Sequence, residues 1–352
     1  MSNKNGFIAQ TDQFGKDNTY SKADKKTNYI VNPGAFAYNP ARINVGSIGY
    51  QNLATPVLVS SLYEVFKTNS QIKDLFLIYW FKTDKFFNQI KKYEEGGVRQ
   101  YYFLDKLLFS EIIIPKDVRE QQKISKILKK LDYLISLQQR KLEYFMTIKA
   151  ELLRSIFPNT IGKRGLHISD QPWKLQTMND IFKEKNIKNE HGKLLSVSIS
   201  KGIYPFSENE RKNNSSNNKS NYKEVKYNDI AYNSMRMWQG ALGVSKYDGI
   251  VSPAYTVITA KKQENPLFYY YYFKNKRMLF NFRQHSQGLT SDTWNLKFPL
   301  FKKIIIQTPI SKKEEQIIAN LFKTLDQNII YTKTKIEKFN YIKQFLLQNM
   351  FI

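Results

Sequence analysis

Hydrophobic residues recur with alternating spacings of four and three positions along two long segments of the chain. The first series is Ile124, Leu128, Leu131, Ile135, Gln138, Leu142, Phe145, Lys149, Leu152 and Ile156. The second series is Ile318, Phe322, Leu325, Ile329, Thr332, Ile336, Phe339, Lys343, Leu346 and Met350. This spacing, sustained over several heptads, predicts two long helices that form coiled-coil seams. Both seams are interrupted by polar residues at matching places, and such residues commonly fix register or orientation.

The two helical segments are copies of one sequence block. The stretch IPKDVREQQKISKILKKLD covers 114–132, and TPISKKEEQIIANLFKTLD covers 308–326. Both copies follow a proline with acidic residues in the first turns, where they complement the helix dipole. The register then continues without a gap to the Leu152-Leu153 and Leu346-Leu347 pairs. Two unrelated long helices are the alternative, but they would not share a gapless register.

The repeat extends into the globular segments that precede the helices. PGAFAYNPARINVGSIGY at 33–50 aligns with YNDIAYNSMRMWQGALGV at 227–244, so that Tyr38-Asn39 matches Tyr232-Asn233. Short apolar runs predict strands at Ala54–Tyr63, Ser252–Ala260, Ile112–Ile114 and Ile304–Ile306. We therefore expect an α+β protein with a first globular domain at 1–111, a central repeat helix at 112–160, a second globular domain at 161–303 and a C-terminal repeat helix at 304–352.

Composition narrows the classes of partner. The chain has 352 residues, 41% of them apolar, which is enough for two domains with cores. Its 55 lysines and arginines against 30 acidic residues give a formal net charge of +25. This excess favours nucleic acid, although acidic lipid or an acidic protein would also suit it. No apolar run could span a membrane, and the absence of cysteine fits a cytoplasmic location.

The sequence offers no convincing catalytic constellation. The three histidines do not have metal-ligand spacing, and no P-loop, G-x-S-x-G or G-x-G-x-x-G motif is present. YNPA at Tyr38–Ala41 matches the Asn-Pro-Pro-aromatic motif of adenine methyltransferases only in part. KEVK at Lys223–Lys226 contains the short E-x-K of some nucleases without a convincing upstream aspartate. A free-standing nuclease or methyltransferase remains an alternative that activity of the purified chain would support.

Side chains suited to reading DNA gather near the two Tyr-Asn blocks. Asn, Gln and Arg pair bidentately with base edges, while Lys and Arg neutralise phosphates. The candidate DNA contacts are Gln13, Lys16, Tyr38, Asn39, Arg42, Lys201, Tyr232, Asn233, Arg236, Trp238 and Gln239. The alternative is that the Tyr-Asn and glycine residues build a turn that the arginine caps. An RNA-binding protein with a coiled-coil arm also stays open.

The repeated blocks resemble the specificity subunit of Type I restriction–modification enzymes. The resemblance rests on Pro115–Pro158, Pro309–Ile352, Trp173–Phe182, Ala37–Gly49 and Ala231–Gly243. It implies two similar target-recognition domains, each reading half of a bipartite duplex DNA target, separated by an antiparallel coiled coil of the repeat helices with pseudo-twofold symmetry. It also implies docking of two methyltransferase (M) subunits, which use S-adenosylmethionine, and of restriction/translocase (R) subunits. The chain itself would bind no cofactor or metal and would catalyse nothing.

The first globular segment departs from this pattern. It has no counterpart of Trp173–Phe182 before its Tyr-Asn block, so we expect the first recognition domain to be short at its N-terminus. An alternative function follows, in which a truncated variant binds methyltransferase subunits, or pairs with itself, without complete target recognition. Replacing Leu131 and Leu325 by Asp should separate the seams in either case, because each buried charge would lack a partner.

Overall fold

The computed structural model describes residues 6–8, 27–97, 100–157, 172–208 and 218–351. The chain divides into two compact units. The first unit comprises Met1–Arg140 and Thr332–Ile352, and the second unit comprises Lys141–Tyr331. Each unit combines a globular part of strands and short helices with portions of both long helices, so the fold is of the mixed α+β class that the sequence predicts.

The globular part of the first unit is built on a small antiparallel sheet with strand order β3-β2-β5 and a separate β1-β4 pair. Its strands are β1 (Tyr29–Val31), β2 (Phe36–Tyr38), β3 (Ile48–Tyr50), β4 (Val57–Val59) and β5 (Glu64–Phe66). Its short helices are α2 (Asp74–Trp80), α3 (Asp84–Tyr93) and α4 (Leu104–Leu108). Phe36, Phe81 and Phe86 form the centre of an aromatic core between the sheet and these helices.

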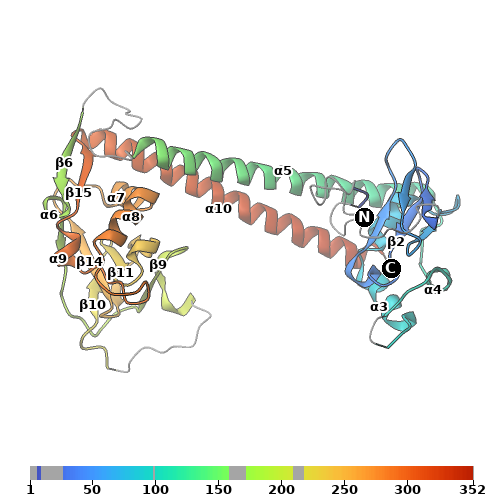
Figure 1. Cartoon of the computed structure of the whole chain (residues 1–352), viewed down its shortest axis with the longest axis horizontal. Coiled ribbons are helices and arrows are strands. Elements are labelled where there is room, and N and C mark those ends of the chain that lie inside the picture. Colours follow the sequence, from blue (N-terminus) through green and yellow to red (C-terminus); the bar gives the residue numbers. More distant parts are fainter. Residues whose placement is uncertain (1–5, 9–26, 98–99, 158–171, 209–217, 352) are drawn as a thin grey trace. The chain divides into compact units, whose positions relative to one another are not determined.

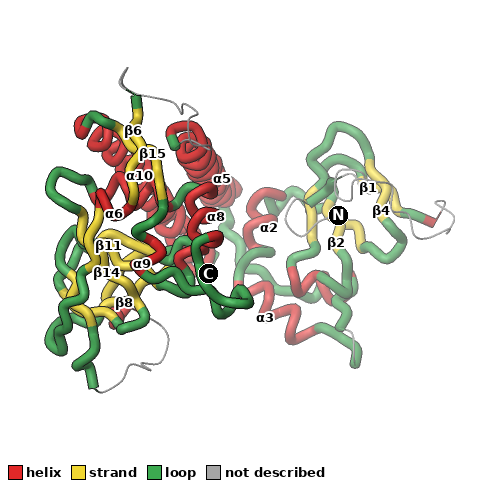
Figure 2. The backbone as a smooth tube through the Cα atoms, turned by 60° about the vertical axis from the view of Figure 1, so that its left-hand side comes forward, coloured by secondary structure: helices red, strands yellow, loops and turns green. Residues whose placement is uncertain are grey.

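The globular part of the second unit has the same plan with one more strand in its main sheet, whose order is β12-β11-β14-β7. Figure 2 labels β11 and β14, the two central strands of this sheet. The strands are β6 (Trp173–Thr177), β7 (Phe182–Glu184), β8 (Leu195–Ser198), β9 (Gly202–Pro205), β10 (Lys223–Val225), β11 (Ile230–Asn233), β12 (Leu242–Val244), β13 (Gly249–Val251), β14 (Tyr255–Ala260) and β15 (Ile305–Pro309). The short helices are α6 (Met178–Ile181), α7 (Pro266–Phe273), α8 (Lys276–Gln284) and α9 (Phe298–Phe301). Further antiparallel pairs are β6-β15, β8-β9 and β10-β13.

Helix α7 supplies much of the second core. Asn265 caps its start by accepting hydrogen bonds from the Leu267 and Phe268 N–H groups, and Pro266 occupies the first turn, where no N–H is needed. The helix is apolar on all faces, and Phe268, Tyr269 and Phe273 are fully buried. The aromatic run is therefore a core element.

The two long helices, α5 (Val118–Ile156) and α10 (Lys312–Asn349), pack against each other within each unit (Figure 1). In the first unit, Leu128 near the start of α5 shares a core cluster with Leu347 near the end of α10. In the second unit, Ile156 at the end of α5 shares a cluster with Phe322 near the start of α10. Each unit thus pairs the beginning of one helix with the end of the other, which is an antiparallel arrangement.

Every position of the predicted seams is buried or half-buried. Ile124, Leu128, Ile135, Ile318, Phe322 and Leu325 are buried, and Leu131, Leu142, Ile329 and Ile336 are half-buried. The 4-3 spacing therefore marks the inward face of both helices, since apolar residues elsewhere on them, such as Tyr144 and Tyr341, are mostly exposed.

Each seam is interrupted by two polar residues, one of which is a lysine. In both helices this lysine forms an ion pair with an aspartate of the other helix. Lys343 lies 2.6 Å from Asp132, which also accepts a hydrogen bond of 2.9 Å from the Tyr79 hydroxyl. In the second unit, Lys149 lies 2.5 Å from Asp326, which accepts a hydrogen bond of 2.9 Å from the Tyr271 hydroxyl. We call each set a Tyr–Asp–Lys triad. Each lysine on one helix thus neutralises an aspartate on the other, while the tyrosine ties the globular part to the helix pair.

One strand prediction is wrong. Ile112–Ile114 is not a strand, whereas its counterpart in the second unit belongs to β15. Strand β15 pairs along its length with β6, from Ile305 opposite Thr177 to Pro309 opposite Trp173. The described part of the first unit has no strand equivalent to β6, so the backbone at 112–114 has no partner with which to form a ladder. A strand needs such a partner, whatever its own propensity.

Among the residues that the structure describes, no helix is both long and apolar enough to cross a membrane.

Candidate nucleic-acid interface

The Tyr-Asn block of the first unit forms a tight loop between β2 and β3. The Asn39 side-chain oxygen accepts a hydrogen bond from the Ala41 N–H, and the Asn39 carbonyl accepts one from the Arg42 N–H. A single 3₁₀ turn, Ile43–Val45, follows and ends at Gly46. Gly46 has a φ of 82°, in the left-handed region that favours glycine, so the turn requires this residue type.

The second unit repeats this loop bond for bond. The Asn233 side-chain oxygen accepts from the Met235 N–H, and the Asn233 carbonyl accepts from the Arg236 N–H. The 3₁₀ turn Met237–Gln239 ends at Gly240, which has a φ of 83°. We call the two structures the Asn-Arg-Gly loops. Their common geometry confirms the turn of the alternative interpretation, but the side chains of Arg42 and Arg236 make no capping hydrogen bond to it.

The arginine side chain is exposed in both loops. Arg42 and Arg236 are exposed, whereas Asn39 and Asn233 are half-buried and use their side-chain oxygens within the loop. The backbone of each arginine is fixed by hydrogen bonds, which limits the positions that its guanidinium group can reach. An arginine on a fixed turn suits bidentate recognition of a guanine edge or a phosphate.

Two predicted DNA contacts are corrected. Tyr38 and Tyr232 have no exposed surface, and their rings pack against Phe66 and Phe301 respectively. Burial raises the pKa of both hydroxyls far above the ordinary value. The tyrosine of each block therefore anchors the start of the Asn-Arg-Gly loop in the core and cannot reach a base.

Lys274 connects two parts of the second unit that carry candidate contacts. Its ammonium group donates hydrogen bonds to the Gly240 carbonyl at 2.6 Å and to the Ile199 carbonyl at 3.0 Å. Gly240 ends the Asn-Arg-Gly loop, and Ile199 lies in the β8-β9 turn that carries the exposed Lys201. Burial, and then repulsion from Lys149, lowers the pKa of Lys274 to about 8. The candidate residues Lys201 and Gln239 thus belong to neighbouring segments.

Trp238 is held by aromatic and backbone contacts. Its indole N–H donates to the Met235 carbonyl at 3.1 Å, and its ring meets Trp294 edge-on with centroids 5.1 Å apart. The Arg283 guanidinium lies over the Trp294 ring at 4.7 Å. Trp238 is half-buried, so part of its ring remains accessible. Sequence inspection missed Lys274, Arg283 and Trp294, because their roles depend on contacts between distant segments.

Two predicted contacts of the first unit, Gln13 and Lys16, lie outside the described residues.

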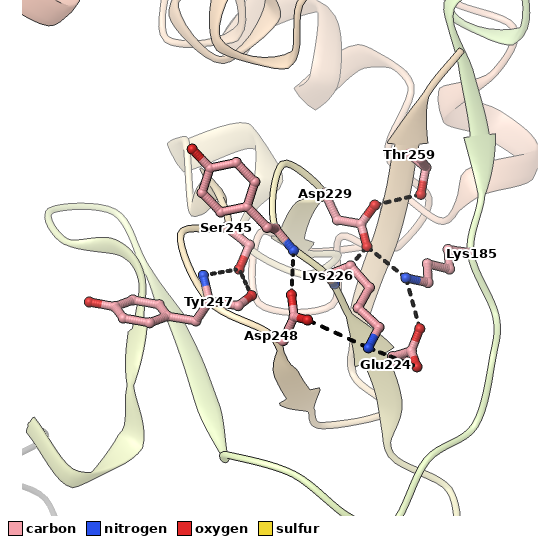
Figure 3. Close-up of polar contacts among 9 residues, drawn as sticks. Lys185, Glu224, Lys226, Asp229, Ser245, Tyr247, Asp248 and Thr259 are labelled. Carbon is pink, nitrogen blue, oxygen red and sulfur yellow. Dashed lines mark hydrogen bonds and ion pairs between the residues drawn. The ribbon is translucent and has the colours of Figure 1, made fainter. Parts of the chain in front are cut away.

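The KEVK stretch belongs to a network of charged side chains in the second unit (Figure 3). Lys185 pairs with Glu224 at 3.0 Å and with Asp229 at 2.9 Å, and Thr259 donates to Asp229 at 2.6 Å. Lys185 lowers the pKa of Glu224, so this carboxylate stays ionised as an ion-pair partner. The network joins β10 to its neighbours, and no group of three or more His, Asp or Glu in the described chain could hold a metal. Glu224 serves in this network as the ion-pair partner of Lys185.

The duplicated loops and repeat helices define a protein built of two similar units. The family model for the Type I restriction modification DNA specificity domain matches residues 2–144 and 170–341. The chain belongs to this family, as its repeated blocks indicate.

Solved structures show the same fold. The Type-I restriction-modification system S subunit from M. genitalium is 14% identical, with a TM-score of 0.57 over 92% of this chain and 84% of that one. The HsdS subunit from Thermoanaerobacter tengcongensis is 12% identical, with a TM-score of 0.50 over 92% of this chain and 81% of that one. Comparison with curated protein sequences found no match.

Proposed function

We propose that this chain is the DNA-reading subunit of a Type I restriction–modification complex and that each unit reads one half of a bipartite duplex target. The observation that carries the proposal is the pair of Asn-Arg-Gly loops, which present Arg42 and Arg236 in the same way in a chain of net charge +25. Two matched readers on one polypeptide suit a target made of two half-sites. Such a subunit acts on DNA in the cytoplasm.

The proposed base and phosphate contacts differ between the units. In the first unit they are Asn39 and Arg42, together with Gln13 and Lys16. In the second unit they are Lys201, Asn233, Arg236, Trp238 and Gln239. Lysines supply affinity through phosphates, whereas the arginines and amides supply sequence discrimination.

The long helices are the proposed docking sites for two methyltransferase subunits, with restriction/translocase subunits joining them. Leu137 on α5 and Tyr331 on α10 occupy equivalent positions of the repeat and are 40% and 64% exposed. Equivalent apolar side chains on both helices offer two similar surfaces to two copies of one partner. In this proposal the chain is not an enzyme and binds no cofactor, and S-adenosylmethionine belongs to the methyltransferase subunits.

A second candidate function is an assembly partner that binds methyltransferase subunits without complete target recognition. The observation that favours it is the first unit's main sheet, which has one strand fewer than the sheet of the second unit in the described residues. A narrower sheet gives the Asn-Arg-Gly loop of the first unit less support when it meets DNA.

The test is co-expression with the methyltransferase subunit in a host without DNA methylation, followed by genome-wide mapping of N6-methyladenine. Methylation of a split, asymmetric motif is expected from two different readers. A stable complex without methylation would favour the assembly partner. Methylation or cleavage by the purified single chain would contradict the non-catalytic assignment.

A further inference from the structure

Lys274 holds one peptide group of the second Asn-Arg-Gly loop. Its ammonium group donates to the Gly240 carbonyl at 2.6 Å, and Leu279 of α8 lies on the same side of this glycine. The N–H at the other end of that peptide group, on Ala241, donates to the Arg236 carbonyl at 3.1 Å. A peptide group is planar and rigid, so fixing its carbonyl also restrains its N–H. Lys274 therefore acts on the backbone of the exposed Arg236 through one rigid unit.

The same ammonium group holds the turn between β8 and β9. It donates to the Ile199 carbonyl at 3.0 Å, and Ile199 lies two residues before the exposed Lys201. The Lys201 N–H donates to the Ser198 hydroxyl at 3.0 Å, so the backbone of the turn is fixed at this residue too. A Cβ atom on Gly243 of β12 would lie only 2.9 Å from the Gly202 Cα, so the strands behind the loop and the turn are in direct backbone contact. The two segments are thus joined at their base and by Lys274.

The groups around Lys274 make the strength of this hold depend on its charge. Burial has the largest effect, Lys149 of α5 repels the ammonium group and Asp326 of α10 attracts it, and together they lower the pKa of Lys274 to about 8. Within α7 the ammonium group lies over the Tyr270 ring at 5.6 Å. The loop and the turn face it with carbonyl groups, since the Lys201 ammonium group lies over an aromatic ring of β9. A charged donor makes the stronger hydrogen bond, so the hold weakens as the pH rises through the pKa.

The first unit has the equivalent lysine without this contact. Lys82 matches Lys274 in the repeat and lies over the Tyr79 ring at 5.0 Å. Among the described residues, nothing lies within 4 Å of the place where a Cβ of the loop residue Gly46 would be. At Gly240 the Cδ atom of Lys274 lies 3.6 Å from that place. The contact between lysine and loop therefore belongs to the second unit, and the first unit supplies a natural control.

We propose that Lys274 is a positioning residue for DNA reading by the second unit. It holds the Asn-Arg-Gly loop and the β8-β9 turn together through one ammonium group, so that Arg236 and Lys201 contact the same half-site in a fixed relation. This inference rests on the proposed function. A phosphate contact places the protein on the duplex, whereas a base contact needs a side chain held in the productive geometry. Loss of the hold therefore lowers sequence discrimination more than it lowers affinity.

The test is competition binding of the complex reconstituted with methyltransferase subunits. The probe is a duplex with the split motif that methylation mapping gives for the wild-type complex, and the competitors vary one half-site at a time. Lys274→Met keeps the apolar stem but removes the donor, so discrimination at one half-site should fall about tenfold, as expected for loss of a charge-assisted hydrogen bond. The other half-site should not change. Lys274→Arg keeps a charged donor and should restore most of the loss, and the matched control Lys82→Met should leave both half-sites unchanged.

A pH profile separates positioning from a merely structural role. In the wild-type complex, discrimination at the affected half-site should fall as the pH rises through about 8, and in Lys274→Met it should not depend on pH in this range. Asp326→Asn removes the attracting charge and should move the midpoint to lower pH. Lys149→Met removes the repelling charge and should move the midpoint to higher pH. Circular dichroism at 222 nm checks that each variant is folded.

Hydrogen exchange gives a readout without DNA. At a fixed pH, the Ala241 N–H should exchange faster in Lys274→Met than in the wild-type chain, whereas the equivalent Ser47 N–H should be unchanged in Lys82→Met. Unchanged exchange at Ala241, or equal loss of discrimination at both half-sites, would overturn the proposal. A wild-type complex that discriminates its half-sites as well as folded Lys274→Met does would overturn the positioning role alone. A wild-type complex that recognises no split motif would instead contradict the proposed function, and with it the role of Lys274 in reading.

Discussion

The two units of the protein share the Asn-Arg-Gly loop and the Tyr–Asp–Lys triad but differ in the described strands of their main sheets. Both carry an Asn-Arg-Gly loop and a Tyr–Asp–Lys triad. In the second unit β7 extends the main sheet beside β14, whereas β5 ends the main sheet of the first unit among the residues that the structure describes. The loop and the triad take the same form in both units despite this difference. The two cores also differ in burial, since Phe301 is fully buried while its counterpart Leu107 is half-buried.

The largest expected effect is unfolding at high pH, which should differ between the units because the second contains more buried tyrosines. Burial raises the pKa of Tyr270 to about 12, and it raises the pKa of Tyr269, Tyr271 and Tyr272 further; Tyr38 and Tyr79 in the first unit are also raised. A raised pKa in the folded state contributes stability that is fully present below the ordinary value of about 10 and is lost as the pH climbs above it. We therefore expect the chain to unfold cooperatively above pH 10, with the second unit the more sensitive.

Absorbance at 295 nm reports tyrosinate, and circular dichroism at 222 nm reports helix. The two signals should change together. Trp80 is the single tryptophan of the first unit, so comparing the fluorescence of the wild-type chain with that of Trp80→Phe separates the units. Smooth ionisation near pH 10 with the helices intact would show that these hydroxyls are accessible, contrary to their burial.

Charges in the helix seam should have the next largest effect. Leu128 in the first unit and Phe322 in the second are equivalent in the repeat and fully buried. Replacing either by Asp should lower the free energy of unfolding by about 3–5 kcal/mol, because the charge is buried without a partner. Urea denaturation followed by circular dichroism measures the loss. The control is Tyr133→Asp on α5, where the side chain is 61% exposed, and an equal loss there would refute the assignment of the seam.

The sequence predicted the seams and the duplicated loops but not the contacts between distant segments. Heptad spacing reports burial directly, so Leu128 and Phe322 could be placed from their positions alone. The partners of the seam lysines were not visible, because Asp132 and Lys343 lie far apart in sequence and no local pattern joins them. Tyr38 was misassigned for a related reason: a tyrosine beside an asparagine and an arginine looks like a polar contact, and only the packing of the sheet shows that its ring faces the core. Strand propensity at 112–114 also misled, since a ladder depends on a second segment.

Replacing one loop arginine at a time should show which half-site each Asn-Arg-Gly loop contacts. If Arg236 reads a guanine edge, Arg236→Ala costs about 1–3 kcal/mol of binding free energy and relaxes one half-site, while Arg42→Ala relaxes the other. Arg236→Lys is the matched control, because it keeps the charge but lacks the planar fork. The measurement is competition binding of the reconstituted complex to duplexes that vary one half-site at a time. Uniform weakening across all sequences, rescued by lysine, would mean that the arginine contacts a phosphate instead.

The smallest expected effect concerns the triads. Asp132→Asn in the first unit and Asp326→Asn in the second remove the negative charge from a half-exposed ion pair but retain a hydrogen-bond acceptor for the tyrosine. Each should cost about 1 kcal/mol in thermal or urea unfolding, near the upper end for partly exposed pairs. Glu151→Gln is the control, because its i,i+3 pair with Arg154 is largely exposed and should contribute little.

A charge exchange tests whether the triads set the pairing of the helices. The double variant Asp132→Lys with Lys343→Asp restores the opposite charges within the first unit and should recover part of the loss caused by Asp132→Lys alone. Combining Asp132→Lys with Lys149→Asp instead changes charges that belong to different triads, so it should add the two losses. Recovery in the second combination but not in the first would mean that the lysine and aspartate partners are wrongly assigned. The triads contribute little to the free energy of unfolding, so we expect them to act on the register of the helix pair. Two seams of similar apolar residues can pack in several registers. The matched charges at Asp132–Lys343 and Asp326–Lys149 disfavour every register but one.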